Sequence, residues 1–265
     1  MKINIIENVH DGFSMTQRQG KFVEWVHDES VGRTIYLENA ICQSIPNGNN
    51  VVGKKYGLLL ESKYINPNLI EHVKQNYISY FTNLELIFTH NDELLQLDTR
   101  FKWCPLVESW IKDKNIYPKS KLVSMISSLK NWTPGHQERL RWADKLRGKV
   151  DCFGQIGIPI HRKEEGLCDY MFSVVIENGF YKSYFTEKIL DCFATGTVPI
   201  YKGCPDIGNH YNMNGIIELT DDFDISILTK ELYESKRDAI LDNLERVKRY
   251  DVTEDYLYHH YFSST

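Results

Sequence analysis

Between residues 56 and 201, short apolar runs typical of β-strands alternate with longer segments whose apolar spacing is typical of helices. Strands are predicted at 56–61, 84–88, 121–126, 150–153, 171–176 and 198–201. Helices are predicted from Pro67, at 92–97 and 134–146, near Arg162, and at 186–194. A crossover between parallel strands needs such a helix to return the chain, so the alternation predicts an α/β protein built on parallel sheets.

The order of these elements restarts after Pro118, which predicts two Rossmann-like domains facing each other across a cleft. The predicted domains are 1–118 and 119–265. The acidic stretch 221–224 and a helical run at 225–249 close the second domain. An aromatic-rich helix at 253–262 is able to pack back on the first half. Residues 1–50 carry no pattern that we can interpret.

Composition excludes several classes of protein. The 265 residues are 42% hydrophobic and 25% charged, with a net charge of −5, which is typical of a globular protein and unlike a nucleic-acid-binding one. The six cysteines are scattered without zinc-type spacing and are expected to be reduced. The apolar run within residues 1–7 is too short for a signal peptide or a membrane span, so we expect a cytoplasmic protein; peripheral membrane contact stays open.

Polar residues follow the most apolar of the predicted strands. The run 171–176 is typical of a strand buried on both faces, and Glu177 and Asn178 come directly after it. Open α/β sheets bind ligands at the carboxyl ends of their strands. Glu177 and Asn178 are therefore candidate binding residues.

The next helix begins with an anion-binding pattern. Thr186 is placed to cap it and Gly196 to end it, while Lys188 falls in the first turn, where the helix dipole disfavours a cation unless an anion is also bound. Backbone N–H groups, Lys188 and the Tyr184 hydroxyl are predicted to cradle a pyrophosphate, and Glu187 to accept hydrogen bonds from ribose hydroxyls. The alternative is a capped amphipathic helix in which Lys188 pairs with a nearby carboxylate.

The same stretch resembles the signature of glycosyltransferase family 10, the α-1,3-fucosyltransferases. The matching residues are Glu177-Asn178, Tyr184-Phe-Thr-Glu-Lys188 and Gly196-Thr-Val-Pro-Ile-Tyr-Lys-Gly203. Similarity extends more loosely back to residue 121. The resemblance implies a GT-B fold, a GDP-sugar donor held by the carboxyl-terminal domain, a glycan acceptor, and transfer with inversion by a metal-independent, cofactor-free glycosyltransferase. The absence of a membrane stem from the sequence points to the bacterial or viral type.

Two further residues are assigned through this resemblance. The run 123–128 is similar to a family strand after which an arginine meets the donor phosphate; Arg139 is the first candidate, with Arg141 and Lys130 as rivals. Glu61 is similar to the carboxylate that ends a family strand and is proposed there as the catalytic base. The alternatives are a surface arginine on a charged helix and a glutamate that merely ends a strand.

Asp222-Phe-Asp224 has the Asp-x-Asp pattern of metal-dependent glycosyltransferases, but it lies after the donor signature, and Asp224 is placed to cap a helix. We therefore predict no metal ion. Two other functions stay open: the same fold with a different nucleotide-sugar donor, and a non-catalytic module that binds a nucleotide or a glycan.

Overall fold

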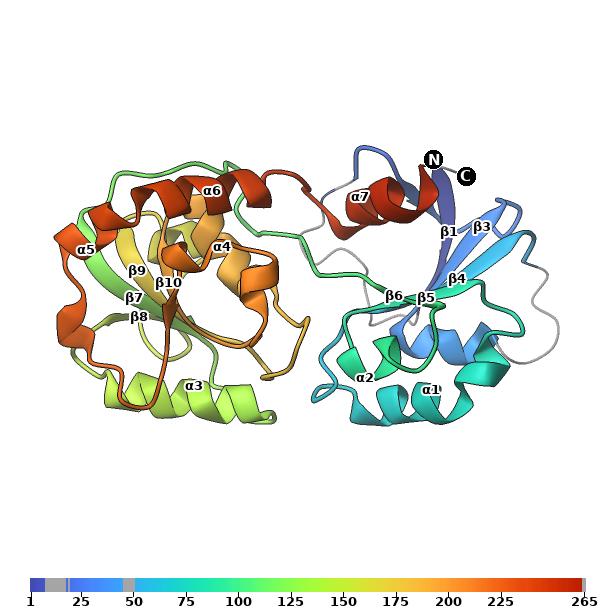
Figure 1. The fold of residues 1–265 in the computed structure, drawn as a ribbon, viewed down its shortest axis with the longest axis horizontal. Coiled ribbons are helices and arrows are strands. Elements are labelled where there is room, and N and C mark those ends of the chain that lie inside the picture. The colour runs from blue at the N-terminus through green and yellow to red at the C-terminus, as the bar shows by residue number, and fades with distance from the viewer. Residues whose placement is uncertain (8–17, 19, 45–50, 264–265) are drawn as a thin grey trace. The chain divides into compact units, whose positions relative to one another are not determined.

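The computed structural model describes residues 1–7, 18, 20–44 and 51–263. The chain forms two compact units (Figure 1). Unit 1 comprises Met1–Leu106 and Val252–Thr265, and unit 2 comprises Val107–Asp251.

Unit 1 contains a six-stranded sheet in the order β2-β1-β3-β4-β5-β6, with every neighbouring pair parallel. The strands are β1 (Lys2–Ile6), β2 (Glu24–Val26), β3 (Arg33–Leu37), β4 (Lys54–Leu59), β5 (Leu86–Thr89) and β6 (Phe101–Trp103). The helical segments are η1 (Glu38–Ser44), α1 (Pro67–Tyr80), α2 (Asp92–Leu95), α7 (Thr253–Leu257) and η6 (Tyr258–Phe262).

Helical segments pack on both faces of this sheet. Leu69 and Val73 of α1 join a buried cluster with Leu59 of β4. The carboxyl-terminal segment also contacts the sheet, because the Phe262 ring lies 5.2 Å from that of Tyr56 in β4. These contacts give each face of the sheet apolar partners, as a parallel sheet requires.

Unit 2 contains a five-stranded parallel sheet in the order β11-β10-β9-β7-β8. The strands are β7 (Lys121–Ser127), β8 (Asp151–Gly154), β9 (Tyr170–Ile176), β10 (Val198–Lys202) and β11 (Ile217–Glu218). The helical segments are α3 (Pro134–Lys145), η2 (Lys163–Gly166), α4 (Glu187–Thr195), η3 (Ile207–Asn209), η4 (Met213–Gly215), η5 (Ile225–Ile227), α5 (Lys230–Ser235) and α6 (Arg237–Val247).

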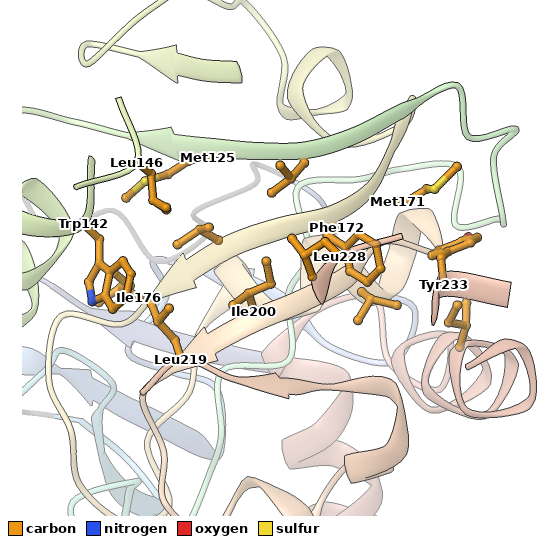
Figure 2. Close-up of a cluster of buried hydrophobic side chains, with 14 residues drawn as sticks. Met125, Trp142, Leu146, Met171, Phe172, Ile176, Ile200, Leu219, Leu228 and Tyr233 are labelled. Carbon is orange, nitrogen blue, oxygen red and sulfur yellow. The ribbon is translucent and has the colours of Figure 1, made fainter. Parts of the chain in front are cut away.

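The core of unit 2 follows from the alternation of side chains along its strands. Alternate residues of β9, among them Phe172 and Ile176, face a cluster that includes Trp142 of α3 and Tyr233 of α5 (Figure 2). Ser173 points the other way and accompanies Ser124 of β7, whose hydroxyl donates to the carbonyl of Gly166 in η2 at 2.6 Å. The sheet is therefore covered on both faces.

The sequence prediction and the structure agree on the α/β class and on two parallel sheets. Each predicted strand is present, although the segment near Arg162 is a short 3-10 helix and 225–249 is divided into η5, α5 and α6. Strands β1, β2, β3, β6 and β11 were not predicted.

The unit boundaries differ from the predicted domains. The division lies at Leu106 instead of residue 118, and 252–265 belongs to unit 1 instead of the second domain. The aromatic side chains of the last segment explain its place, because the Tyr261 hydroxyl donates to the carbonyl of Trp103 in β6 at 2.7 Å.

Candidate functional site

The strand order of unit 2 creates a site for a ligand. The chain runs from β7 outward to β8 and then returns to β9 on the other side of β7, so the connections after β7 and β9 diverge. Open α/β sheets bind their ligands at such a switch point, beyond the carboxyl ends of the strands. A cavity of about 260 Å³ lies there, lined by residues of β7, β9, α3, η2 and α4.

The start of α4 is fixed by a buried carboxylate. Glu177 has no exposed surface, and its two oxygens accept from the backbone N–H of Thr186 at 2.9 Å and from the Thr186 hydroxyl at 2.7 Å. Thr186 in turn caps the helix by accepting from the backbone N–H of Lys188. Glu177 thus acts as a support for the helix start.

Lys188 and Glu187 both line the cavity. The Lys188 ammonium donates to the Thr186 hydroxyl at 3.0 Å and lies 3.3 Å from a Glu187 oxygen and 3.6 Å from Glu177. Although burial opposes ionisation, Lys188 and Lys163 lower the pKa of Glu187 to about 2. Glu187 is therefore an ionised acceptor beside a cation at a helix N-terminus.

Arg139 of α3 reaches the same cavity from the other side of the switch point. Its side chain is largely buried; Nε donates to the carbonyl of Ile176 at 3.2 Å and Nη2 to Oδ1 of Asn178 at 2.8 Å. Gly135 allows α3 to approach so closely, because a Cβ at this position would lie 1.7 Å from the carbonyl oxygen of Glu177.

The two rivals of Arg139 lie in other environments. Arg141 pairs with Glu138 and Asp221 at 2.6 Å each on the surface. Lys130 lies 5.2 Å over the ring of Trp132, which is 70% exposed. The structure thus brings Arg139 to the cavity together with Glu187 and Lys188.

Tyr184 is predicted to contribute its hydroxyl to the ligand site. Its side chain is 2% exposed, and its ring stacks on that of Tyr181 with the centroids 4.6 Å apart. Within the described part of the chain, the residues that line the cavity do not include Tyr184, Glu177 or Asn178. A direct contact of these three residues with a ligand stays a prediction.

Glu61 belongs to unit 1, two residues after β4, and its side chain is exposed. The backbone here is held by two buried groups. Glu38 accepts from the backbone N–H groups of Leu60 and Glu61 at 2.5 and 2.9 Å, and His90 Nε2 bonds the Leu60 carbonyl at 2.7 Å. Burial lowers the pKa of His90 to about 4, so its ring is neutral at neutral pH. These contacts fix the position of the Glu61 backbone.

Lys163 and Asp191 also line the cavity, although no pattern in the sequence indicates them as binding residues. The Lys163 ammonium lies 2.7 Å from Asp191 and 3.6 Å from Glu187. Asp191 resembles any polar residue of an amphipathic helix, and Lys163 belongs to none of the motifs that indicate a binding residue, so neither carried a signal in the sequence.

Asp224 caps η5, as predicted, by accepting from the backbone N–H of Ser226 at 2.9 Å. Across the described residues, no group of three or more His, Cys, Asp or Glu side chains is arranged to hold a metal ion. Over the same residues, no helix is both long and apolar enough to cross a membrane.

Comparison with known proteins finds a family model that resembles residues 116–240. They match the model described as glycosyltransferase family 10 (fucosyltransferase), carboxyl-terminal domain. The matched segment spans less than half of the chain. It contains every cavity-lining residue named above, as well as Glu177, Asn178 and Tyr184, whereas Glu61 lies outside it.

The chain is also similar to individual fucosyltransferases. Over 91 residues the chain is 32% identical to the α-(1,3)-fucosyltransferase FucT of Helicobacter pylori; the match spans 34% of this chain and 19% of that relative. A crystal structure of an α1,3-fucosyltransferase superposes with a TM-score of 0.54 at 17% identity, covering 92% of this chain and 80% of the other. A crystal structure of an α1,3-fucosyltransferase with GDP gives 0.52 at 16% identity with the same coverage. These structural matches show the fold, which is that of GT-B-like fucosyltransferases.

Proposed function

We propose that this chain transfers fucose from GDP-fucose to a hydroxyl group of a glycan. The observation that carries the proposal is the cavity at the switch point, lined jointly by Arg139, Glu187 and Lys188. Two cations beside a helix N-terminus suit a diphosphate, and an ionised carboxylate next to them suits the hydroxyls of a ribose. The guanine base and the fucose are inferred from the family of residues 116–240 and from the relative crystallised with GDP.

In this proposal unit 2 is the donor-binding unit. Arg139 and Lys188 neutralise the charge that develops on GDP as the bond between its terminal phosphate oxygen and the anomeric carbon breaks. Asn178 holds Arg139 in place by accepting its hydrogen bond, and Glu177 holds Lys188 in place through the ion pair at 3.6 Å and through Thr186. This charge stabilisation uses side chains of the protein and no metal ion.

Unit 1 supplies the acceptor side and the base. The carboxylate of Glu61 takes the proton of the acceptor hydroxyl while the acceptor oxygen attacks the anomeric carbon from the face opposite to GDP, which inverts the configuration. Support for Glu61 comes from its place after β4, where Glu38 and His90 fix the backbone. Such a fixed backbone is what a base needs in order to meet its substrate reproducibly.

The donor is tested by calorimetry with GDP, UDP and ADP, followed by transfer assays with GDP-fucose, GDP-mannose and UDP-galactose on a panel of glycans. We expect guanine nucleotides to bind preferentially and fucose to be transferred. Binding without a preference for guanine overturns the donor assignment. Preferential GDP binding without transfer to any acceptor favours a non-catalytic module.

The base is tested with Glu61→Gln, which removes the proton acceptor and keeps the shape of the side chain. We expect turnover to fall by about 10²-fold or more, with the affinity for GDP unchanged. Glu85→Gln is the matched control, because Glu85 is another glutamate of unit 1 with a half-exposed side chain, paired with Lys54 at 3.3 Å. Equal turnover of Glu61→Gln and Glu85→Gln removes Glu61 as the base.

A further inference from the structure

Lys163 has no role in the function proposed above, yet it lies in the cavity. It is the first residue of η2, on the segment between β8 and β9, and its side chain is 27% exposed. Its ammonium group contacts two carboxylates of α4, Asp191 at 2.7 Å and Glu187 at 3.6 Å. Lys163 therefore connects η2 to the first two turns of α4.

Asp191 anchors Lys163. Its side chain is 1% exposed, and the oxygen that does not contact Lys163 accepts from the Ser109 hydroxyl at 2.8 Å and from the backbone N–H of Trp110 at 2.7 Å. Both oxygens of this buried carboxylate thus have partners. Since Asp191 is held from the Ser109 side, it fixes where the Lys163 ammonium lies.

Glu187 lies four residues before Asp191 on α4 and shares the Lys163 ammonium with it. The ammonium of Lys188 lies 3.3 Å from the same Glu187 oxygen, Oε1, that Lys163 contacts. Two cations from different segments therefore share one oxygen of a carboxylate that is 14% exposed. A flexible glutamate held in this way presents its remaining acceptor positions in one direction.

We propose that Lys163 is a positioning residue of the nucleotide site: it holds the Glu187 carboxylate ready to accept hydrogen bonds from the ribose hydroxyls of the donor. This inference rests on the proposed function, because it assumes that a nucleotide occupies the cavity. It implies that three residues, Lys163, Glu187 and Asp191, together make the site prefer ribose over deoxyribose. In this proposal Lys163 contacts the two carboxylates, whereas Arg139 and Lys188 bind the diphosphate.

The test compares the affinities of GDP, 2′-deoxy-GDP, 3′-deoxy-GDP and inorganic pyrophosphate for the full chain by calorimetry. In the wild-type protein we expect GDP to bind about tenfold or more tightly than at least one deoxy analogue, because a lost hydrogen bond to a charged group has roughly that effect. In Lys163→Met this ratio is expected to fall below about threefold, with the affinity for pyrophosphate within about threefold of wild type. Glu187→Gln is expected to lower this affinity ratio as well. The double variant is expected to lower the ratio no further than either single variant does.

Two further variants separate positioning from general damage. Lys163→Arg keeps the charge and is expected to keep the ratio. Lys202→Met removes a matched lysine, 30% exposed and 2.7 Å from Glu138, and is expected to leave the ratio unchanged. Thermal unfolding establishes that each variant is folded.

Three results overturn the inference. Loss of affinity for GDP, the deoxy analogues and pyrophosphate by the same factor in Lys163→Met means that Lys163 binds phosphate directly. An unchanged ratio in Lys163→Met means that Glu187 needs no such support. Loss of the ratio in a folded Lys163→Arg means that the charge is not what positions Glu187. Failure of the wild-type protein to bind GDP is a different result, which contradicts the proposed function itself.

Discussion

Thr186→Val tests how the start of α4 is held. The substitution keeps the shape of the side chain and removes the hydroxyl that donates to Glu177 at 2.7 Å and accepts from the backbone and ammonium of Lys188. Loss of an N-cap costs about 1 kcal/mol. Loss of a hydrogen bond to a buried charged group costs about 1.5–3 kcal/mol more, because Glu177 has no exposed surface through which water could replace the hydroxyl.

The matched control is Thr229→Val. Thr229 caps α5 by accepting from the backbone N–H of Leu232 at 3.1 Å. This threonine is exposed, and among the described residues its hydroxyl contacts no buried carboxylate. We therefore expect Thr229→Val to lower the free energy of unfolding by about 1 kcal/mol and Thr186→Val to lower it by about 2.5–4 kcal/mol. Thr186→Ser, which keeps the hydroxyl, is expected to lie close to wild type.

The measurement is urea-induced unfolding of each full-length variant, followed by tryptophan fluorescence and compared at constant m-value. Trp142 lies in the core of unit 2 and reports on the unit that contains both threonines. Equal losses for Thr186→Val and Thr229→Val would refute the reasoning, because they would show that Glu177 contributes nothing beyond an ordinary cap.

Three further outcomes are expected. Arg139→Lys keeps the charge but loses the planar group that donates hydrogen bonds to Ile176 and Asn178, so calorimetry should show that GDP binds about tenfold or more weakly. Arg141→Ala should leave the affinity for GDP unchanged. Equal effects of the two substitutions would contradict the assignment of Arg139. Gly135→Ala forces a Cβ against the Glu177 carbonyl and should lower the free energy of unfolding by about 1–3 kcal/mol in urea; a neutral result would show that α3 lies further from β9. In the unfolded chain histidine takes up a proton near pH 6.5, whereas buried His90 takes one up only near pH 4. The stability that comes from the neutral form of His90 is therefore present above pH 6.5 and is lost as the pH falls from 6.5 to about 4. Denaturation at several pH values should show wild type losing roughly 3 kcal/mol more than His90→Gln across this range, and parallel losses would contradict the burial of His90.

The sequence predicted those parts of the fold that local pattern determines. Buried parallel strands such as β9 appear as unbroken apolar runs, and Thr186 and Gly196 mark the ends of α4 because capping depends on neighbouring residues. Short strands such as β2 and β6, with three residues each, give no periodicity, so they were missed. The place of residues 252–265 depends on aromatic contacts with β4 and β6 that no local pattern contains.

The site was predicted in part for the same reason. Lys188 and Glu187 follow from the helix start, which is local. Tyr184 was expected to face a ligand, but its stacking on Tyr181 is a tertiary contact. Lys163 comes from a segment 24 residues before Glu187, and only the folded sheet brings the two together.

The central claim is that the cavity between β7 and β9 binds the diphosphate of a nucleotide, and hydrogen exchange of the backbone amides with and without GDP tests it most directly. We expect GDP to slow exchange at 186–191 and at 127–139, the segments that contain Glu187, Lys188 and Arg139. A second cavity of about 490 Å³ in unit 2, lined by residues between Phe180 and Asp221 that include Gly203 and Thr220, provides the contrast. Slower exchange confined to 203–220, with 186–191 and 127–139 unchanged, would contradict the account.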